Sequence, residues 1–322
     1  MPLALINNPR SRKNRRCLDR FTKRARHCLA DRFFEPRTQA ELRSVIEKLH
    51  RQSIRTIAIS GGDGTISDVM TALYHVYGED DLPELAIFPS GNSNLIARDV
   101  GFKSRGRRAF ERLLHDPQSL TKEKRGTLRI NWTDQGAQLR IGMFHGTTGF
   151  TRAIEIAHSP HLLRFAPHNL AVAATLIATL WKLLHRKYRN MWLDGDRLRL
   201  ECDGAVRSDG PSFLFISTAL DRLTMGMWPF WDGDADPRRN PTGLRFLNVS
   251  GHPQHLWRAV RLLVRGRSPN WLRQHPSYHS DRVDSLTMTC PSDFILDGEK
   301  FSSGPSRQVT LSNGPQFQFL HD

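Results

Sequence analysis

A short β-branched run that enters a glycine-rich loop and continues as a helix is the strongest constraint on how this chain folds. Residues 54–60 (IRTIAIS) have the composition of a buried strand, and residues 61–65 (GGDGT) follow at once. Apolar side chains then recur at helical spacing, at Ile66, Val69, Met70, Leu73 and Tyr77. This order of strand, glycine loop and helix predicts a unit of a mostly parallel sheet covered by helices.

The same alternation occurs on both sides of this segment. The predicted elements are strands at 3–6 and 85–88, a basic helical segment ending near residue 30, and helices at 41–50 and from residue 95 to 100. We therefore expect residues 1–126 to form a three-layer α/β nucleotide-binding domain.

After about residue 125 the pattern changes to short strand-like runs separated by turn residues. These runs are 127–132, 138–144, 197–202, 212–217, 244–249, 285–289 and 308–311, with helices expected near 168–184 and 254–265. This pattern predicts that residues 127–322 form a mainly antiparallel β-sandwich domain, and we expect the tail at about 308–322 to pack back onto the first domain.

The composition excludes several classes of protein. With 322 residues, 25% of them charged and a mean hydropathy of −0.48, the chain is neither collagen-like, low-complexity nor an integral membrane protein. The most apolar stretch, residues 170–184, is shorter than the ~20 residues that span a bilayer. Four scattered cysteines without metal-ligand spacing indicate reduced thiols and a cytoplasmic protein.

The chain is strongly basic, because 47 Lys and Arg residues against 32 Asp and Glu residues leave a formal charge of +15. Basic residues crowd two segments, 10–26 and 103–108. They could face an anionic lipid surface, a nucleic acid or a polyphosphate substrate, or simply be solvated helix faces. No nucleic-acid-binding motif accompanies them, so we expect no nucleic-acid partner.

The glycine loop at 61–65 is suited to phosphate, since backbone N–H groups at a helix N-terminus attract anions. Asp63 would repel a bare phosphate. Its presence indicates a magnesium ion, a ligand hydroxyl or a structural hydrogen bond to the loop. An ordinary tight turn is the alternative.

Four motifs in order give the chain a resemblance. They are residues 8–11 (NPRS), 59–65 (ISGGDGT), 88–97 (FPSGNSNLIA) and 296–299 (LDGE). Together they resemble the diacylglycerol kinase catalytic-domain family, which includes sphingosine kinases and bacterial lipid kinases.

The resemblance implies an ATP- and Mg²⁺-dependent kinase that phosphorylates a lipid hydroxyl, most simply that of a diacylglycerol-like lipid, with ATP between the two domains. It implies that Glu299 is the catalytic base and that Asp297 and Asp63 are further catalytic residues. The nucleotide-binding residues that it implies are Asn8, Pro9, Ser11, Gly61, Gly62, Gly64, Thr65, Gly91, Asn92 and Asn94.

The spacing of Asp297 and Glu299 also predicts a function without the resemblance. In an extended segment, residues two apart point to the same face, so both carboxylates could serve one site. One would take the proton of an attacking alcohol while the other orients the alcohol or a hydrated metal. The alternative is a solvated Asp-Gly turn.

Two stretches depart from the family pattern. The family has Gly-Thr-x-Asn-Asp where this chain has residues 91–95 (GNSNL), so Asn92 and Leu95 replace a hydroxyl and a carboxylate. Bacterial members carry an aspartate-rich metal segment where this chain reads Asn-Pro-Thr-Gly-Leu at 240–244. Asp232, Asp234 and Asp236 lie just upstream, but no metal ligand is assigned.

A Met- and Trp-rich run at 225–231 predicts either a lipid-contacting surface or ordinary core.

Two other functions stay open: an NAD-kinase-like enzyme with a soluble substrate, and a catalytically inactive regulatory protein. For a lipid kinase the expected partners are ATP, a lipid alcohol and an anionic membrane on which a cytoplasmic protein lies peripherally. A homodimer also stays open.

Overall fold

The computed structural model describes residues 3–16, 20–104, 106–134, 138–157, 190, 192–223, 227–231 and 243–322. The chain divides into two compact units. The first comprises Met1–Thr127, Arg140–Gly142 and Gly314–Asp322, and the second comprises Leu128–Leu139 and Met143–Asn313.

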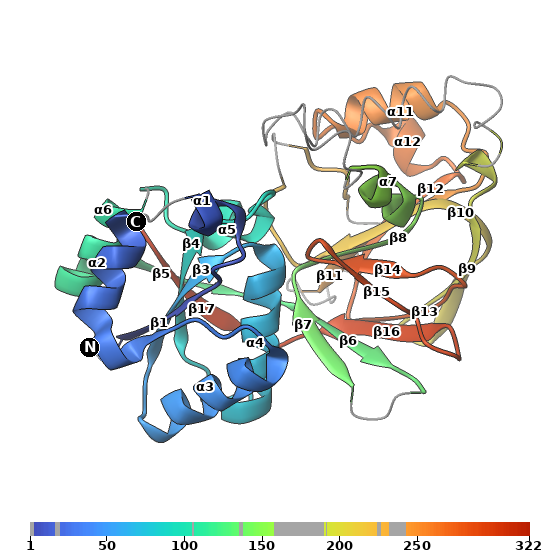
Figure 1. Ribbon diagram of the computed structural model, residues 1–322. Coiled ribbons are helices and arrows are strands. Elements are labelled where there is room, and N and C mark those ends of the chain that lie inside the picture. The colour runs from blue at the N-terminus through green and yellow to red at the C-terminus, as the bar shows by residue number, and fades with distance from the viewer. Residues whose placement is uncertain are drawn as a thin grey trace. The chain divides into compact units, whose positions relative to one another are not determined.

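The first unit is built on a six-stranded sheet in the order β2-β1-β3-β4-β17-β5 (Figure 1). Its strands are β1 (Leu3–Asn7), β2 (Phe33–Phe34), β3 (Thr56–Gly61), β4 (Glu84–Pro89), β5 (Thr121–Arg125) and β17 (Phe317–His321). All neighbours are parallel except β17 and β5. Every residue of β1 and β3 is buried, as expected for a parallel sheet covered on both faces.

Helices cover the two faces of this sheet (Figure 1). The helices are α1 (Arg12–Arg16), α2 (Arg20–Leu29), α3 (Gln39–Arg51), α4 (Asp63–Tyr77), α5 (Leu95–Val100) and α6 (Arg107–His115). On one face, Phe21 of α2 and Phe110 of α6 pack in a common core with Phe88 of β4. Leu42, Ile46 and Leu49 of α3 are buried at helical spacing, which confirms the predicted helix at 41–50.

The strand order reverses direction in the middle of the sheet. The chain runs outward from β1 to β2 and then returns to place β3 and β4 on the other side of β1. In open parallel sheets, ligands bind beyond the carboxyl ends of the two strands that flank such a reversal. The loops that follow β1 and β3 are therefore the expected ligand-binding loops of this unit.

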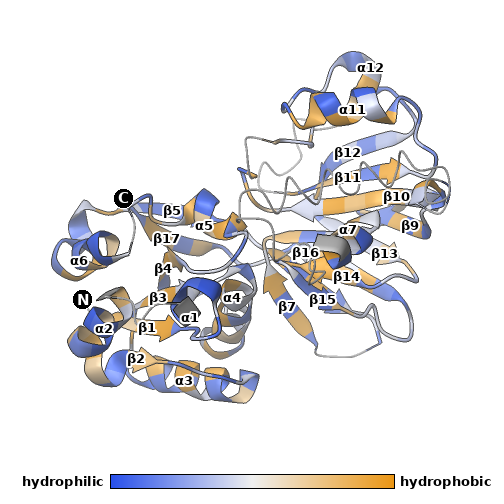
Figure 2. Ribbon diagram, turned by 45° about the horizontal axis from the view of Figure 1, so that its top comes forward, coloured by the Kyte–Doolittle hydropathy of each residue, from blue (hydrophilic) through white to orange (hydrophobic). Residues whose placement is uncertain are grey.

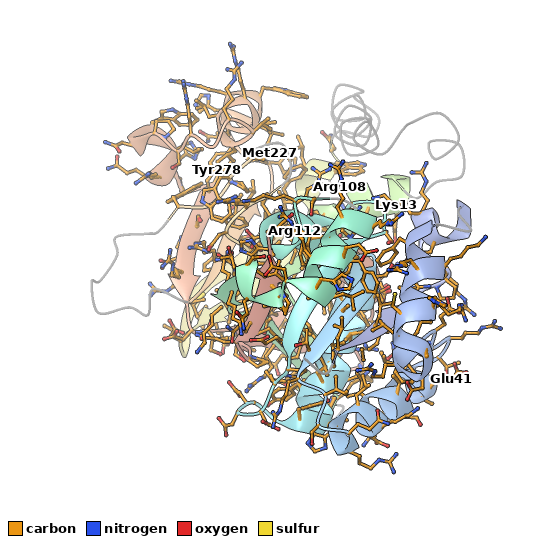
Figure 3. The ribbon with its side chains drawn as sticks, turned by 90° about the vertical axis from the view of Figure 1, so that its left-hand side faces the viewer. Lys13, Glu41, Arg108, Arg112, Met227 and Tyr278 are labelled. Atoms are coloured by element: carbon orange, nitrogen blue, oxygen red, sulfur yellow. The ribbon has the colours of Figure 1, made fainter. Side chains whose placement is uncertain are left out.

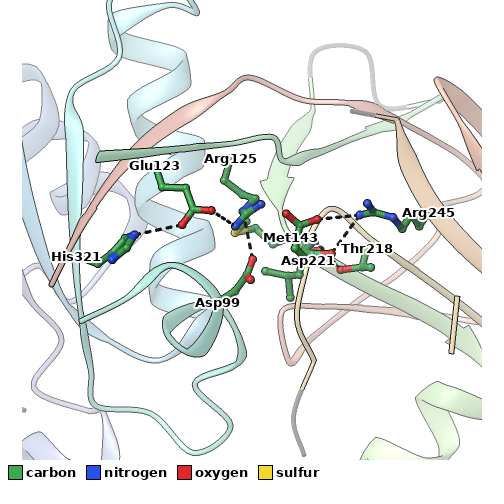
Figure 4. A network of polar contacts seen from close by, with 9 residues as sticks. Asp99, Glu123, Arg125, Met143, Thr218, Asp221, Arg245 and His321 are labelled. Atoms are coloured by element: carbon green, nitrogen blue, oxygen red, sulfur yellow. Dashed lines mark hydrogen bonds and ion pairs between the residues drawn. The ribbon is translucent and has the colours of Figure 1, made fainter. Parts of the chain in front are cut away.

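The last strand of the chain completes the first sheet. β17 pairs in parallel with β4 and antiparallel with β5. Figure 4 shows how side chains join these strands: His321 contacts Glu123 (3.2 Å), and Glu123 contacts Arg125 (2.5 Å). Arg125 also pairs with Asp99 of α5 at 3.4 Å. Residues 308–322, expected to return to the first domain, are thus divided, because β16 (Gln308–Asn313) belongs to the second unit.

The second unit is an antiparallel β structure. Its strands are β6 (Leu128–Trp132), β8 (Phe144–Thr148), β9 (Asp196–Cys202), β10 (Ala205–Thr218), β11 (Leu244–Ser250), β12 (Tyr278–Val283), β13 (Ser285–Thr289), β14 (Phe294–Leu296), β15 (Glu299–Phe301) and β16. They follow the order β15-β14-β8-β10-β9-β13-β16-β6, with β11 and β12 continuing from β10. Their inward side chains form one apolar core that includes Phe215, Phe246 and Phe294.

Three helices of the described residues accompany these strands, namely α7 (Gly149–Ala157), α11 (Leu256–Leu263) and α12 (Asn270–Arg273). A short strand, β7 (Leu139–Gly142), precedes β8. The hydropathy colouring in Figure 2 shows strands that alternate between hydrophobic and hydrophilic residues, as in antiparallel sheets with one covered face.

The predicted fold class, an α/β domain followed by a mainly antiparallel β domain, is confirmed. Strands that pattern alone did not predict are β2, β5, β12, β14, β15 and β17, together with β8, of which the expected run 138–144 covers only the first residue. The helix expected at 168–184 and the acidic residues at 232–236 lie outside the described residues. No helix in the described part of the chain is long and apolar enough to cross a membrane.

Candidate functional site

The loops after β1 and β3 are joined by side-chain hydrogen bonds. Asn8 Nδ2 donates to Thr65 Oγ1 at 2.7 Å, and the Asn8 backbone N–H donates to the carbonyl of Ser60 at 2.9 Å. The Asn8 side-chain oxygen accepts from the backbone N–H of Arg10 (2.9 Å), which shapes the turn. The structure thus brings together the first two motifs, with Ser11 buried and Pro9 half-buried beside Asn8.

The glycine loop after β3 lies against the loop after β4. A Cβ atom added to Gly91 would lie 2.4 Å from the Cα of Gly62, well inside van der Waals contact. The backbone N–H of Ser90 also donates to the carbonyl of Gly61 (2.8 Å). Only glycine permits such an approach of two backbones, which explains both glycines without reference to a ligand.

Asp63 connects these two loops through its carboxylate. One carboxylate oxygen accepts from the Ser93 hydroxyl (2.6 Å) and the Leu95 N–H (2.9 Å), and the other accepts from the Ile96 N–H (3.0 Å). Leu95 and Ile96 open α5, whose own N-cap residue, Asn94, makes no side-chain capping bond. Asp63 therefore caps α5 from another helix.

Asp63 is 5% exposed, and this burial raises its pKa, while the hydrogen bonds from Ser93, Leu95 and Ile96 oppose the shift. Of the three roles considered for Asp63, the structure shows the structural hydrogen bond, made to the next loop rather than to its own. Leu95 takes part through its backbone N–H, so its apolar side chain leaves this contact intact.

The loop at 91–94 is closed by its own asparagine. Asn94 has a left-handed backbone (φ 49°), and its side chain bonds both the N–H and the carbonyl of Gly91, at 2.8 and 2.9 Å. Asparagine tolerates this conformation better than other non-glycine residues. Asn92, by contrast, is exposed. Of the predicted nucleotide-binding residues here, Asn94 shapes the loop and Asn92 presents its side chain to solvent.

Two residues of α1 complete the loop cluster and were not predicted. Asn14 Nδ2 donates to the Asn7 side chain (2.9 Å) and to the carbonyl of Asn8 (2.8 Å). Lys13, labelled in Figure 3, donates from Nζ to the carbonyl of Pro89 at 2.9 Å. Nothing in their spacing distinguishes them from other polar residues of a basic helix. Asn14 also reaches the carbonyl of Ser60, 46 residues away, and the Lys13 partner Pro89 is 76 residues away, so these contacts leave no local pattern.

The N-terminus of α4 is the anion-attracting feature of this cluster. The helix begins at Asp63 after an N-cap glycine, Gly62, and the N–H groups of its first turn include those of Gly64 and Thr65. Such groups have no carbonyl acceptor within the helix and carry its positive dipole end. Because the Asp63 carboxylate is bonded to α5, it does not cap these groups.

The last motif lies in the second unit, at a tight hairpin between β14 and β15. Leu296 pairs with Glu299, and the two residues between them, Asp297 and Gly298, both have positive φ (49° and 88°). This corrects the expectation of an extended segment. A two-residue hairpin with both φ values positive is the turn that Asp-Gly favours, because glycine adopts this conformation freely.

The two carboxylates of this motif consequently have different surroundings. Asp297 is buried, and its oxygens accept from the N–H groups of Met143 (3.0 Å) and Phe144 (2.9 Å). It therefore fixes the hairpin to the start of β8. Glu299 is exposed at the first position of β15. Of the two, Glu299 has the accessibility that a base needs.

Next to Glu299, Lys300 lines a polar cavity of about 300 Å³. Its ammonium pairs with Glu155 (2.7 Å) and Asp293 (3.1 Å), and Arg152 pairs with Asp196 (2.5 Å) on the same cavity. Both cations of the cavity are thus paired with its three carboxylates.

The structure also bears on the metal site and on the Met- and Trp-rich run at 225–231. In the described residues, no group of three or more His, Cys, Asp or Glu side chains is arranged to hold a metal. Phe230 and Trp231 of the Met- and Trp-rich run are buried, and Trp231 exchanges hydrogen bonds with Ser280 (3.0 and 2.9 Å). These two residues are core, while Met225 lies outside the described residues.

Comparison with known proteins shows that the first unit is similar to a known family. Residues 2–121 match the diacylglycerol kinase catalytic domain family. This stretch lies within the first unit and contains the loop cluster, so the similarity to that family covers the part of the chain that holds the candidate site. The family that the motifs resemble is thereby confirmed.

The similar proteins agree with this assignment. Over 56 residues the chain is 43% identical to the probable lipid kinase YegS of Escherichia coli, a stretch of 17% of this chain and 18% of that relative. The Shigella boydii protein of the same name matches equally. The match thus spans less than one fifth of the length of these relatives.

Solved structures share the fold. A putative diacylglycerol kinase from Bacillus anthracis has a TM-score of 0.66 at 14% identity, covering 99% of this chain and 96% of that one. Yeast NADH kinase complexed with NADH has a TM-score of 0.50 at 8% identity, covering 100% and 84%. At these identities the likeness concerns the fold alone.

Proposed function

We propose that the protein is an ATP-dependent lipid kinase that transfers the γ-phosphate of ATP to the hydroxyl of a diacylglycerol-like lipid. The observation that carries this proposal is the contact between two glycine loops, those after β3 and β4. They lie beside the reversal of strand order, within the residues that match the diacylglycerol kinase catalytic domain. The YegS relatives, named probable lipid kinases, support a lipid as the acceptor.

In this proposal the loop cluster of the first unit binds the nucleotide. The N–H groups at the start of α4, which include those of Gly64 and Thr65, hold the ATP phosphates. Asn8 and Thr65, bonded to each other, border this position. The Lys13 ammonium adds a positive charge beside the same loops.

Magnesium fits this site only as a partner of the nucleotide. Mg²⁺ is commonly held by one or two carboxylates together with substrate phosphates and water. Asp63 is the one acidic residue in residues 8–14, 60–65 and 89–96. Since its oxygens already accept three hydrogen bonds, the ATP phosphates would supply most of the ligands. Bound there, the ion would neutralise charge on the transferred phosphoryl group.

Glu299 is the proposed general base of the reaction. As the lipid hydroxyl oxygen bonds to the γ-phosphorus, the bond to the β–γ bridging oxygen breaks and ADP leaves. The hydroxyl proton passes to the Glu299 carboxylate. Asp297 does not touch the reactants in this scheme, because its carboxylate holds the hairpin against the N–H groups of β8. It is a positioning residue.

The reaction can be tested with the full-length protein, labelled ATP, Mg²⁺ and diacylglycerol in mixed micelles. We expect labelled lipid from the wild type, and a loss of at least about 100-fold for Glu299→Gln, since general-base catalysis contributes 10²–10⁴-fold. Glu201→Gln, which changes a carboxylate on β9 of the same unit, should keep full activity.

The same assay distinguishes the alternatives. Phosphorylation of NAD in place of lipid would make the protein an NAD-kinase-like enzyme. Binding of ATP without transfer to any lipid of a total extract would indicate an inactive regulatory protein. Unchanged turnover of Glu299→Gln would remove this residue from the role of base.

A further inference from the structure

The helix α11 of the second unit exposes large apolar side chains. Trp257 is 47% exposed, and Val264, directly after the helix, is 39% exposed. Among the described residues only Val206 is a comparably exposed large apolar residue. Ala259 and Leu263 are buried on the opposite side of α11. Because Trp257 and Val264 are seven residues apart, they lie on one face, two helical turns from each other.

Arginines surround this apolar pair. Residues 251–280 contain five arginines and no Asp or Glu. Arg261 and Arg265 follow Trp257 at spacings of four and eight residues and are exposed on the same face. We define the α11 surface as the exposed residues Trp257, Arg258, Arg261, Val264, Arg265 and Arg267. Figure 2 shows the mixture of hydrophobic and hydrophilic residues on α11.

The charges of the α11 surface are not neutralised within the described residues. None of its four arginines pairs with a carboxylate there; the Arg258 guanidinium instead lies 4.6 Å from the ring centre of Trp271 on α12. α11 and α12 lie side by side (Figures 1 and 2). No carboxylate of the described residues therefore competes with an anionic partner for these arginines.

The basic clusters of the first unit differ in this respect. Arg24 and Arg107 share Glu111 at 3.2 and 3.5 Å, and Arg26 pairs with Glu35 at 2.6 Å. Figure 3 shows Arg108 and Arg112 projecting from α6, and Arg112 pairs with Asp322 at 3.1 Å. Part of the positive charge expected there from sequence is thus compensated within the fold.

We propose that the α11 surface docks the protein on an anionic lipid bilayer. Trp257 and Val264 enter the boundary between headgroups and acyl chains, and the arginines bind lipid phosphates. The apolar pair favours a bilayer over a nucleic acid, whose backbone would leave Val264 without a partner. A second copy of the chain is disfavoured, because its α11 surface carries the same charge. The proposal names the membrane contact of the proposed lipid kinase.

The test measures binding of the full-length protein to vesicles and needs no phosphate transfer. We expect sedimentation with phosphatidylcholine vesicles that contain phosphatidylglycerol, and little with phosphatidylcholine alone. Each arginine near an anionic surface contributes about fivefold to binding, so Arg261→Gln with Arg265→Gln should lower the partition coefficient about 30-fold at low salt. Val264→Ser should lower it further.

Matched controls are available on the same unit. Arg197→Gln with Arg199→Gln removes two exposed arginines of β9, and Val206→Ser removes the other exposed large apolar residue. We expect neither to change binding by more than about twofold, since these residues lie outside the α11 surface. A blue shift of tryptophan emission on vesicle binding should be smaller in Trp257→Phe.

Two patterns of binding, and one combination of activity without binding, would overturn the proposal. One is vesicle binding that the α11 variants and the β9 controls reduce equally. The other is retention of a DNA duplex, reduced by the α11 variants, without binding to anionic vesicles, which would make the partner a nucleic acid. Kinase activity in detergent micelles with no vesicle binding would reject the docking surface while leaving the proposed function intact.

Discussion

Asp63 and Asp297 serve the same physical purpose in different units. Each is a buried carboxylate that accepts backbone N–H groups from a segment far away in the sequence, α5 for Asp63 and the start of β8 for Asp297. A carboxylate with charge-assisted bonds to N–H groups is a strong anchor, roughly twice as strong as a neutral acceptor. Both aspartates thus hold in place the loops that carry the proposed chemistry.

Asp63→Asn should loosen the loop at 91–96 as well as lower activity. The amide would place an NH₂ donor opposite an N–H donor of α5, because asparagine offers only one acceptor oxygen. We expect a loss of about 1–3 kcal/mol in the free energy of unfolding and faster amide hydrogen exchange at Leu95 and Ile96. Ser93→Ala, which removes one of the three donors, should have the smaller effect. Wild-type exchange in Asp63→Asn would show that the cap is dispensable.

His145 makes stability depend on pH. It is fully buried between Phe215 and Phe294, with ring centres 5.9 and 5.2 Å away, and this burial lowers its pKa to about 3. The unfolded chain binds a proton near pH 6.5. Between these values the unfolded state holds more protons, so His145 contributes stability above pH 6.5 that is lost as the pH falls toward 3.

Urea unfolding at a series of pH values checks this expectation. Wild type should lose on the order of 1 kcal/mol per pH unit below pH 6.5 through this residue. His145→Phe, similar in size and surrounded by aromatic rings, should show a shallower pH dependence. Parallel curves for the two proteins would assign the pH dependence to other groups.

Among the elements, the loops at 61–65 and 91–94 form one structural unit. Each is shaped by its neighbour: Gly91 contacts Gly62, Asp63 bonds Ser93, and Asn94 closes its own turn. A substitution in one loop should therefore change the conformation of the other.

Gly91→Ala tests this coupling. Its Cβ would lie 2.4 Å from the Gly62 Cα, so the loops must separate. We expect a loss of about 1–3 kcal/mol, as for overpacking elsewhere, and weaker binding of ATP by calorimetry. Gly126→Ala is the matched control, because a Cβ there meets nothing within 4 Å. Equal ATP affinity in both variants would argue against the coupling.

On the scale of the whole molecule, the two ends of the chain belong to one sheet. β17 lies between β4 and β5, and Phe317, Phe319 and Leu320 are at most 1% exposed. The Asp322 side chain adds hydrogen bonds to the N–H groups of Lys103 (2.7 Å) and Ser104 (3.2 Å). The first unit is therefore complete only when the last residues have been added.

Deletion of residues 314–322 should unfold the first unit. Burial of three large apolar side chains contributes at least about 5 kcal/mol, which is comparable to the stability of a whole domain. We expect loss of helical circular dichroism and rapid proteolysis within residues 20–104. The control is Gln318→Ala, on the same strand, which should change stability by less than about 0.5 kcal/mol. A folded, protease-resistant truncated protein would contradict this expectation.

Local pattern was sufficient for the elements whose side chains repeat with a clear period. The strand before the glycine loop, the amphipathic helix at 41–50 and the fold class follow from apolar spacing. Three of the four motifs lie in residues 2–121, the stretch that matches the diacylglycerol kinase catalytic domain. β5 (TKEKR) was missed because its residues are charged and its neighbour, β17, is almost two hundred residues away. Such a strand is determined by its partner, not by its own composition.

The sequence by itself determined the residue types at the candidate site: two glycine loops, their asparagines and the acidic pair near the end. Only the tertiary structure decided what each of them does. It turned Asp63 and Asp297 toward backbone N–H groups and left Glu299 exposed. It also neutralised part of the N-terminal charge, whereas the arginines of α11 pair with no carboxylate in the described part of the chain. The physical reason is that hydrogen bonds and ion pairs depend on which groups meet in space, and a linear pattern carries no information about such partners.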